Sequence, residues 1–297
     1  MRSAFFDTLL ELAGRDERIW LVTGDLGFSV VEKFAERYPR QFLNAGVAEQ
    51  NMTGLAAGLA LSGKIVFTYS IANFPVMRCL EQIRNDVCYH ALNVKVVAVG
   101  GGLSYAGMGY SHHAVEDLAV TRVLPNMTVL APGDPVEARW ATRTAASHPG
   151  PVYLRLGKAG EPVVHVGTPE FALGKAVRLR DGERMALFTT GGILPVAAQV
   201  AEELGAALWS VPSIAPFDLA TVVAEARRTG CVVSIEEHGE GGLSSLVAVA
   251  LAGVPCRYRA VRLPREPLAI AGTQDELRAA YGLDAAGILG TLRRWLA

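Results

Sequence analysis

The sequence has no excess of charge of one sign. Its 297 residues include 28 Lys and Arg and 29 Asp and Glu, so the formal net charge is −1. Because like charges form no block, we expect neither nucleic acid nor an anionic membrane as a partner. Long apolar runs are also missing, since a stretch such as SLVAVALAGV from Ser245 is too short to span a bilayer. The N-terminal segment alternates apolar and charged residues, unlike a signal peptide, and we therefore expect a cytoplasmic protein.

Cysteine is scarce, and metal-binding spacings are absent from the sequence. The four cysteines form no CxxC pair, which argues against a zinc site or a disulfide framework and favours reduced, buried thiols. His112 and His113 are adjacent, but neighbouring side chains diverge and are poorly placed to share one metal ion. We therefore predict no metal ligand on this chain.

The sequence does contain a large apolar fraction and a regular alternation of elements. Hydrophobic residues make up 51% and charged residues 19%, and the length suits two domains of roughly 150 residues each. Apolar strand-like runs alternate with helical patterns in both halves, so we predict an α/β protein with two doubly wound domains. An irregular stretch with prolines and glycines separates the halves. The predicted division is a domain at 1–162, a linker at 163–175 and a domain at 176–297.

The same patterns place individual elements. In the first half they predict helices at 3–12, 31–38 and 49–61, and strands at 19–23, 42–44, 65–69, 94–99 and 127–131. In the second half they predict strands at 185–189, 207–211 and 231–235, with helices between them.

The most informative segment is FLNAGVAEQNMTGLAAGLAL at 42–61. Glu49 follows small residues and precedes a helix rich in Ala and Gly, which puts a carboxylate at a crowded helix start. The helix dipole favours a negative charge at that position, and this role alone would explain the residue. A functional carboxylate is the second interpretation.

This segment resembles one found in a known family. GVAEQNMTGLAAGLALSG is similar to the glycine-isoleucine-x-glutamate segment in the pyrimidine-binding domain of transketolases and 1-deoxyxylulose-5-phosphate synthases, which use thiamine diphosphate. CLEQIRNDVCYHALNVKVV, SHHAVEDLAVTRVLPNMTVLAPGDPVEA and GPVYLRLGKAG follow in the family's order, and CVVSIEEHGEGGLSSLVAVAL resembles its last domain. The resemblance covers nearly the whole chain and implies a pyrimidine-binding domain followed by a transketolase C-terminal-like domain.

The resemblance also implies a cofactor site. Glu49 matches the glutamate that hydrogen-bonds a ring nitrogen of the cofactor's aminopyrimidine, and a desolvated carboxyl group can share a proton there. Phe74, in YSIANFPVM, matches an aromatic residue of the pyrimidine pocket, whose lining would include Asp25 and Ile71. Ile71 and Met77 stand where transketolases commonly have aromatic residues, so the pocket would be lined differently here.

Substrate-binding residues are implied in the same way. His112 matches a histidine that hydrogen-bonds substrate oxygens near the reactive carbon, so Glu49 and His112 are the predicted catalytic residues. Arg2, Ser29 and Lys158 match residues that hold the phosphate of a sugar phosphate. Arg155 lies beside Lys158 in the sequence and completes the predicted substrate-binding set.

Two positions depart from the family pattern in the acceptor channel. Gly100 stands where many transketolases have a phosphate-binding histidine. Met108 replaces an aspartate that reads an acceptor hydroxyl. We therefore do not assume that the ordinary pentose phosphates are the substrates, and small sugars or sugar phosphates stay as the predicted class.

One part of the family's cofactor site is absent. The family binds the diphosphate through magnesium on a Gly-Asp-Gly motif in a separate domain, and this motif does not occur in the sequence. We therefore predict a split enzyme, in which a second polypeptide supplies the diphosphate site and the Mg²⁺ ligands. Two-fold symmetry is the commonest closure of soluble assemblies, so we expect a heterotetramer with two copies of each chain.

The predicted reaction is transfer of a two-carbon ketol unit from a ketose, expected to be phosphorylated, to an aldehyde. Three alternatives stay open: a β subunit of a 2-oxo-acid dehydrogenase, an enzyme similar to 1-deoxyxylulose-5-phosphate synthase, and a non-catalytic relative that kept the fold for binding. Glu236, Glu237 and His238 could suggest an acid-base cluster, but we expect them to have a structural or interface role.

Overall fold

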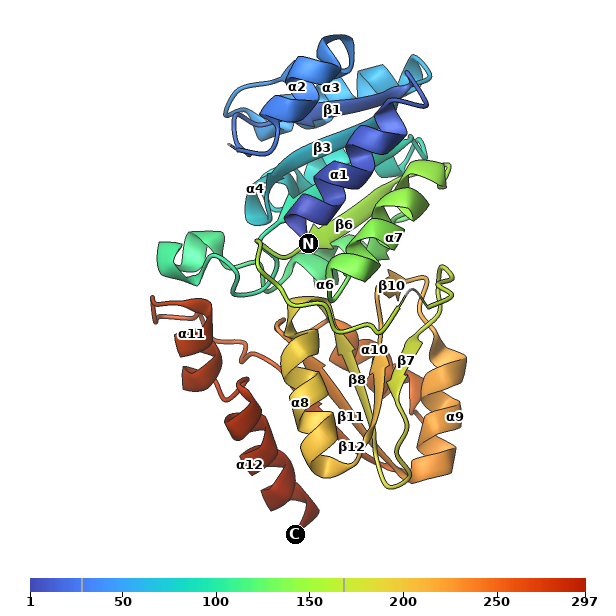
Figure 1. Cartoon of the computed structure of the whole chain (residues 1–297), viewed down its shortest axis with the longest axis vertical. Coiled ribbons are helices and arrows are strands. Elements are labelled where there is room, and N and C mark those ends of the chain that lie inside the picture. Colours follow the sequence, from blue (N-terminus) through green and yellow to red (C-terminus); the bar gives the residue numbers. More distant parts are fainter. Residues whose placement is uncertain (28, 168) are drawn as a thin grey trace.

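The computed structural model describes residues 1–27, 29–167 and 169–297. Two α/β domains are stacked along the long axis of the molecule, each built around its own sheet (Figure 1). The N-terminus lies near the junction of the domains and the C-terminus at the far end of the second one (Figure 1). No helix among the described residues is long and apolar enough to cross a membrane.

The first sheet has seven strands in the order β10-β5-β6-β4-β3-β1-β2. Thr23, at the end of β1, is in register with Asn44 of β2 and Tyr69 of β3, so the carboxyl ends of these parallel strands form one edge. The bounds are β1 Ile19–Thr23, β2 Phe42–Asn44, β3 Ile65–Ile71, β4 Val94–Val99, β5 Thr128–Leu130, β6 Val152–Leu156 and β10 Ser213–Ala215.

Helices cover both faces of this sheet. α1 (Arg2–Ala13) and α7 (Pro135–Ser147) pack side by side on one face (Figure 1). Asp134 fixes the start of α7, because its side chain accepts hydrogen bonds from two backbone N–H groups of the first turn. The remaining helices of this domain are α2 Glu32–Arg37, α3 Glu49–Leu61, α4 Asn73–Val76, α5 Leu80–Gln82 and α6 Asp117–Arg122, with a π-helical turn at Ile83–Cys88.

The second sheet has five strands in the order β12-β11-β8-β9-β7. All neighbours are parallel except β7, which pairs antiparallel with β9. The bounds are β7 Val177–Arg180, β8 Ala186–Thr190, β9 Ala207–Ser210, β11 Cys231–Glu236, β12 Arg257–Val261, α8 Leu194–Leu204, α9 Leu219–Thr229, α10 Leu243–Ala250, α11 Gln274–Ala280 and α12 Ala285–Leu296. α8 and α9 both end at a glycine in the left-handed conformation, as helices commonly do.

The two domains share part of their core. A continuous apolar cluster runs from Val22 and Met52 in the first domain to Phe188 and Val232 in the second. β10 lies within the second half of the sequence, yet it completes the first sheet by pairing antiparallel with β5. The domains are therefore joined by packing and by a shared strand, which fixes their relative position at the site.

The fold class predicted from the sequence is confirmed, with mostly parallel sheets in both halves. The predicted strands at 19–23, 42–44 and 94–99 and the helix at 49–61 coincide with β1, β2, β4 and α3. The antiparallel strands β7 and β10 were not expected, and the prediction also missed β6 and β12. The domain boundaries stay a prediction.

Candidate active site at the carboxyl edge of the first sheet

Four connections at the carboxyl edge of the first sheet carry the predicted site residues. They follow β1, β2, β3 and β4, and they include Asp25, Glu49, Phe74 and His112 respectively. In parallel α/β sheets this edge is where ligands bind. Folding therefore brings together residues that are far apart in the sequence.

Glu49 begins α3 and its side chain is only 1% exposed. A Cβ added to Gly24, just after β1, would lie 3.4 Å from Glu49 Cγ, so the Glu49 side chain packs beside this turn. Arg78 Nη1 donates a hydrogen bond of 2.7 Å to Glu49 Oε2. The buried carboxylate is therefore held by a guanidinium as well as by the start of the helix.

Arg78 also covers the ring of Phe74. Its guanidinium carbon lies 4.8 Å from the ring centroid, which is a cation–π arrangement. His112 meets the same ring edge-on, with 5.1 Å between centroids. Both contacts lie at an open groove of about 630 Å³ that is lined by Asn73, Phe74, Met77, Arg78, Tyr110, Ser111, His113 and Glu116.

The histidine pair is held by backbone and side-chain contacts. Asn73 Nδ2 donates to the carbonyl oxygens of Ser111, at 3.2 Å, and His113, at 2.6 Å. His112 Nδ1 lies 2.9 Å from Ser111 Oγ. Burial lowers the pKa of His112 and the neighbouring His113 lowers it further, so a neutral imidazole faces the site near pH 7.

His113 differs from His112 in its surroundings. It is buried, and its Nδ1 has no hydrogen-bond partner among the described residues. Its Nε2 lies 3.4 Å from the Ala106 carbonyl oxygen. No role was predicted for this residue from the sequence.

Tyr105 occupies the space next to Gly100. A Cβ at residue 100 would lie only 2.1 Å from a ring carbon of Tyr105, so the histidine of other transketolases does not fit here. Lys158 Nζ lies 5.2 Å from the Tyr105 ring centroid, and the His112 ring lies 6.5 Å from it. Tyr105 thus connects a predicted substrate ligand with a predicted catalytic residue.

Arg2 lies close to two phenols of the same region. Burial raises the pKa of Tyr69 and of Tyr105, and the positive charge of Arg2 counteracts this in both. Arg2 Nε and the Tyr69 hydroxyl are buried and have no partner within the described ranges.

The observed contacts of three further predicted residues are with other side chains and the core. Asp25 has a left-handed backbone, with φ of 55°, and its Oδ1 accepts a 2.9 Å hydrogen bond from Asn44 Nδ2. Ser29 is exposed and its N–H donates to Glu32 Oε1. Ile71 is partly buried against the core under α1. Their proposed contacts with cofactor or substrate stay predictions.

Arg155 requires a correction. Its guanidinium is buried, and it donates to Asp117 Oδ2 at 2.8 Å and to the carbonyl oxygens of Ala114 and Glu237. Proximity to Lys158 in the sequence suggested a phosphate ligand, but β6 carries Arg155 into the contact between the domains. We therefore remove it from the substrate-binding set.

Three residues of the site, Arg78, Tyr105 and Asn73, were not predicted from the sequence. Arg78 lies between YSIANFPVM and CLEQIR, two segments that carry the family resemblance. Its position one helical turn after Phe74 is the signal that could have found it, because residues at i and i+4 share a helix face.

Comparisons with known proteins identify the family. The domain described as transketolase, pyrimidine binding domain, matches residues 1–160, and the domain described as transketolase, C-terminal domain, matches residues 174–288. The chain belongs to the transketolase family. The predictions of this family and of its two domain types are confirmed.

Several relatives of this transketolase chain are themselves named as subunits. It is 38% identical to a subunit of the apulose-4-phosphate transketolase of Phocaeicola vulgatus, over 98% of this chain and 95% of the relative. It is 37% identical to the 6-deoxy-6-sulfo-D-fructose transketolase subunit SqwH of Clostridium sp. strain MSTE9, over 97% and 92%. The prediction of a transketolase subunit is therefore confirmed.

A solved structure gives the same result. A protein described as a split gene transketolase, inactive beta4 tetramer, superposes with a TM-score of 0.89 at 36% identity, over 99% of this chain and 96% of that one. The transketolase of Leishmania mexicana shares the fold, with a TM-score of 0.80 at 21% identity, and this chain covers 45% of it.

The residues of this transketolase chain fit the pyrimidine half of thiamine diphosphate. A buried carboxylate, Glu49, and an aromatic face, Phe74, lie on either side of Arg78 at the edge of an open groove. The described part of the chain offers no cluster of three or more His, Cys, Asp or Glu residues that could hold a metal ion.

Proposed function

We propose that this chain is the pyrimidine-binding subunit of a two-component transketolase that moves a two-carbon ketol unit from a ketose with an anionic end to an aldehyde. The observation that carries the proposal is the buried Glu49 carboxylate next to Phe74, with His112 in contact with that same ring. Each group has a place in the reaction that its chemistry suits.

Thiamine diphosphate, when bound, supplies the stabilisation of the carbanion that ketol transfer requires. Glu49 would hold and return a proton at a ring nitrogen of the aminopyrimidine, in a site where burial excludes competing water. Phe74 would support one face of that ring. His112 would move a proton at a substrate oxygen, since its neutral imidazole can both accept and donate.

The anionic end of the substrate would meet Arg2, Lys158 and Ser29. The charges of Arg2 and Lys158, which both lie near Tyr105, support this, because two cations would attract a phosphate or sulfonate group. Two relatives are named for apulose-4-phosphate and for 6-deoxy-6-sulfo-D-fructose, and both names denote a sugar with a tetrahedral anionic group. A phosphorylated or sulfonated ketose is therefore the proposed donor class.

A partner subunit would cover the exposed side of α3. Val47 and Leu61 are 73% and 72% exposed there, and a Cβ added to Gly54 or Gly58 would meet no other atom within 4 Å. Such an open apolar face next to Glu49 suits close packing of another chain. We propose that this partner supplies the diphosphate and Mg²⁺ ligands and that two copies of each chain form the enzyme.

The solved relative described as an inactive beta4 tetramer supports the need for a partner. Its description says that an assembly of that subunit alone has no activity. We propose the same for this chain. Its four cysteines are free, which suits a reducing compartment and supports the expected cytoplasmic location.

A synthase similar to 1-deoxyxylulose-5-phosphate synthase is the second candidate. The synthase of Syntrophotalea carbinolica is 35% identical over 98% of this chain, but the chain spans only 47% of that protein. The named transketolase subunits match over almost their whole length, which favours the two-component enzyme.

The first test is calorimetric binding of thiamine diphosphate with Mg²⁺ to this chain alone and to its mixture with the partner subunit. Tight binding only in the mixture is expected. Ketol transfer is then measured for the wild type and for Glu49→Gln, where we expect a loss of about 10²- to 10⁴-fold, the usual range for removing an acid-base group. Glu81→Gln, an exposed glutamate on α5, is the matched control. Undiminished turnover of Glu49→Gln would contradict the catalytic role.

A further inference from the structure

The loop that carries His112 starts with three consecutive glycines, and each one makes room for a different side chain. Tyr105 covers Gly100. A Cβ on Gly101 would lie 2.6 Å from Arg155 Nε, and one on Gly102 would lie 2.4 Å from Glu237 Oε2. The loop therefore leaves β4 in close contact with a glutamate of the second domain.

The two ends of this loop meet at a narrow neck. Gly102 N donates to the Ala114 carbonyl oxygen at 2.9 Å, and Ala114 N donates back to the Gly102 carbonyl oxygen at 3.0 Å. The segment between them, which includes Tyr105, Met108 and His112, is closed by this one antiparallel pair. The position of the neck therefore constrains where His112 lies in the site, together with the hydrogen bonds from Asn73.

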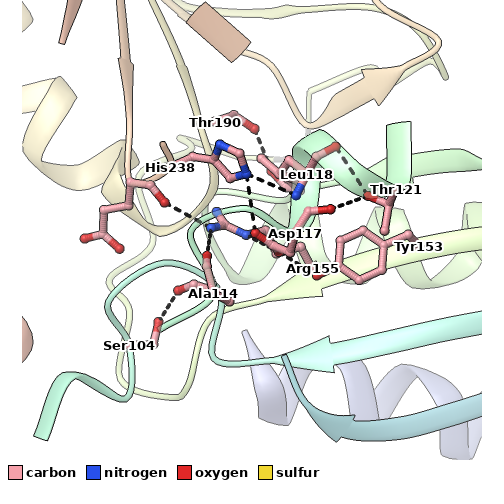
Figure 2. A network of polar contacts seen from close by, with 12 residues as sticks. Ser104, Ala114, Asp117, Leu118, Thr121, Tyr153, Arg155, Thr190 and His238 are labelled. Atoms are coloured by element: carbon pink, nitrogen blue, oxygen red, sulfur yellow. Dashed lines mark hydrogen bonds and ion pairs between the residues drawn. The ribbon is translucent and has the colours of Figure 1, made fainter. Parts of the chain in front are cut away.

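The second domain binds the neck from both sides. Glu237 Oε2 accepts a 3.2 Å hydrogen bond from Leu103 N, just after the first strand of the neck. Gly239 N donates at 2.7 Å to the carbonyl oxygen of Val115, just after the second. Arg155 Nη2 joins the domains by donating to the carbonyl oxygens of Ala114, at 2.8 Å, and Glu237, at 3.0 Å (Figure 2).

His238 extends this contact to the helix that follows the loop. Its Nε2 lies 3.2 Å from Leu118 N and 3.4 Å from Ala119 N at the start of α6 (Figure 2). Backbone N–H groups donate, so Nε2 accepts and the proton is on Nδ1, which lies 3.1 Å from the Gly239 carbonyl oxygen. A histidine of the second domain thus caps a helix of the first.

Glu237 is itself fixed by α11. Arg278 forms an ion pair with Glu237 Oε1, and its Nη2 donates at 3.0 Å to the Gly192 carbonyl oxygen. Gln274 Nε2 also donates to the Glu237 carboxylate, at 3.1 Å. Glu237 and His238 are both almost inaccessible to solvent. A buried charge with a complete set of partners holds one geometry, because any shift leaves a polar group unpaired.

We infer that residues 237–239 of the C-terminal domain form a clamp that positions the His112 loop for the reaction. Glu237 and His238 are positioning residues, since they act on the substrate through the loop and do not line the groove. The C-terminal domain therefore has a part in the chemistry of the first domain as well as in assembly. This inference rests on the proposed function only where it names His112 as a substrate ligand.

The test replaces Glu237 by alanine, which removes the acceptor of the Leu103 N–H. In the free chain we expect faster backbone hydrogen–deuterium exchange in peptides covering 103–113, measured by mass spectrometry. In the complex with its partner we expect the rate of ketol transfer to fall about 10- to 100-fold, because a small displacement of a catalytic group lowers the rate by a comparable factor. Deuterium exchange at the reactive carbon of bound thiamine diphosphate, which depends on Glu49, should change less than about 2-fold, because the clamp does not touch Glu49.

Glu237→Gln is the conservative variant, because it keeps an oxygen that can accept from Leu103, and it should recover most of the transfer activity. Glu225→Ala is the control, since it breaks a partly buried ion pair with Arg228 in the same domain, away from the loop. If backbone hydrogen–deuterium exchange in the loop is unchanged in Glu237→Ala, the clamp is overturned. The clamp is also overturned if the rate of ketol transfer and the rate of deuterium exchange at the cofactor's reactive carbon fall by equal factors.

If Glu237→Ala does not fold, His238→Gln gives the same comparison through the cap of α6. Unaltered exchange in peptides covering 103–119 would then overturn the clamp. A wild-type complex that binds cofactor but transfers no ketol unit would refute the proposed function, whereas the exchange measurements on the free chain would still decide the clamp.

Discussion

The guanidinium of Arg78 binds Glu49 and covers Phe74 at the same time. Arg78 Nη1 lies 2.7 Å from Glu49 Oε2, and the guanidinium carbon lies 4.8 Å from the Phe74 ring centroid. These two residues are the ones proposed to hold the pyrimidine ring. A pyrimidine ring bound as proposed would therefore compete with Arg78 for these contacts.

This relationship predicts that Arg78→Met binds thiamine diphosphate more tightly in the complex with the partner subunit. Breaking the ion pair with Glu49 opposes binding in the wild type, and a half-exposed pair is worth about 1 kcal/mol, or about 5-fold in the dissociation constant. Calorimetry on the complex measures it. Arg84→Met is the control, because Arg84 contacts only Asn85 at the surface among its described side-chain partners. Weaker binding by Arg78→Met would mean that Arg78 contacts the cofactor.

The sequence predicts local elements well where a short apolar run ends at a turn residue. β1 ends at Thr23, just before Gly24, and α3 follows small residues, so both were placed correctly. The site depends instead on contacts between distant segments. Arg78 reaches Glu49 across 29 positions, and Arg155 reaches Glu237 across 82, and no local pattern encodes either pair. β10 was missed for the same reason, since its three residues form a strand only by pairing with β5.

Tyr105 should influence the choice of substrate. Its ring fills the space over Gly100 and lies against the Lys158 ammonium group. We predict that Tyr105→Ala lowers the preference for a phosphorylated ketose over its unphosphorylated counterpart by about 2- to 5-fold, the worth of an exposed cation–π contact. Steady-state kcat/KM values for the two ketoses measure this preference. Tyr105→Phe keeps the ring and should keep the preference, so an equal change in both variants would contradict the role of the ring.

The open glycines of α3 give a test of the partner surface. We predict that Gly58→Ala stabilises the free chain by about 0.5 to 1 kcal/mol, because Gly58 lies within a helix and a Cβ there meets no other atom within 4 Å. Urea denaturation of the free chain measures this gain.

Gly58→Leu should also leave the free chain folded but prevent assembly with the partner, as seen by size-exclusion chromatography. Ala224→Leu, at an exposed position of α9, is the matched control for added bulk. Normal assembly of Gly58→Leu would place the partner on another surface.

A buried histidine fastens the start of the segment between the domains to the first domain. His165 Nδ1 lies 3.0 Å from Asp134 Oδ2, and Nε2 lies 3.4 Å from Glu137 Oε1. Burial lowers the pKa of His165, but the hydrogen bond with Asp134 and the charges of both carboxylates outweigh it, so that the net pKa is raised. Burial raises the pKa of Glu137 to about 7.

Both shifts give stability the same pH dependence. The folded chain holds the proton on His165 more tightly than the unfolded chain does. The resulting contribution to the free energy of unfolding is therefore complete below the pKa of His165 in the unfolded chain, and it is lost as the pH rises through the pKa of His165 in the folded chain. Glu137 also retains a proton in the folded chain between 4.5, its ordinary pKa, and about 7, so stability falls with rising pH there as well. Glu137 is present in both chains, so the His165 shift carries the comparison with His165→Gln: we predict that the free energy of unfolding of the wild type, relative to this variant, decreases from about pH 5.5 to about pH 8.5. Urea denaturation at these two values measures it, with His90→Gln as the control at an exposed position. A difference that stays constant or grows with pH would show that His165 is neutral in the folded chain, and the ion pair with Asp134 would then be an ordinary hydrogen bond.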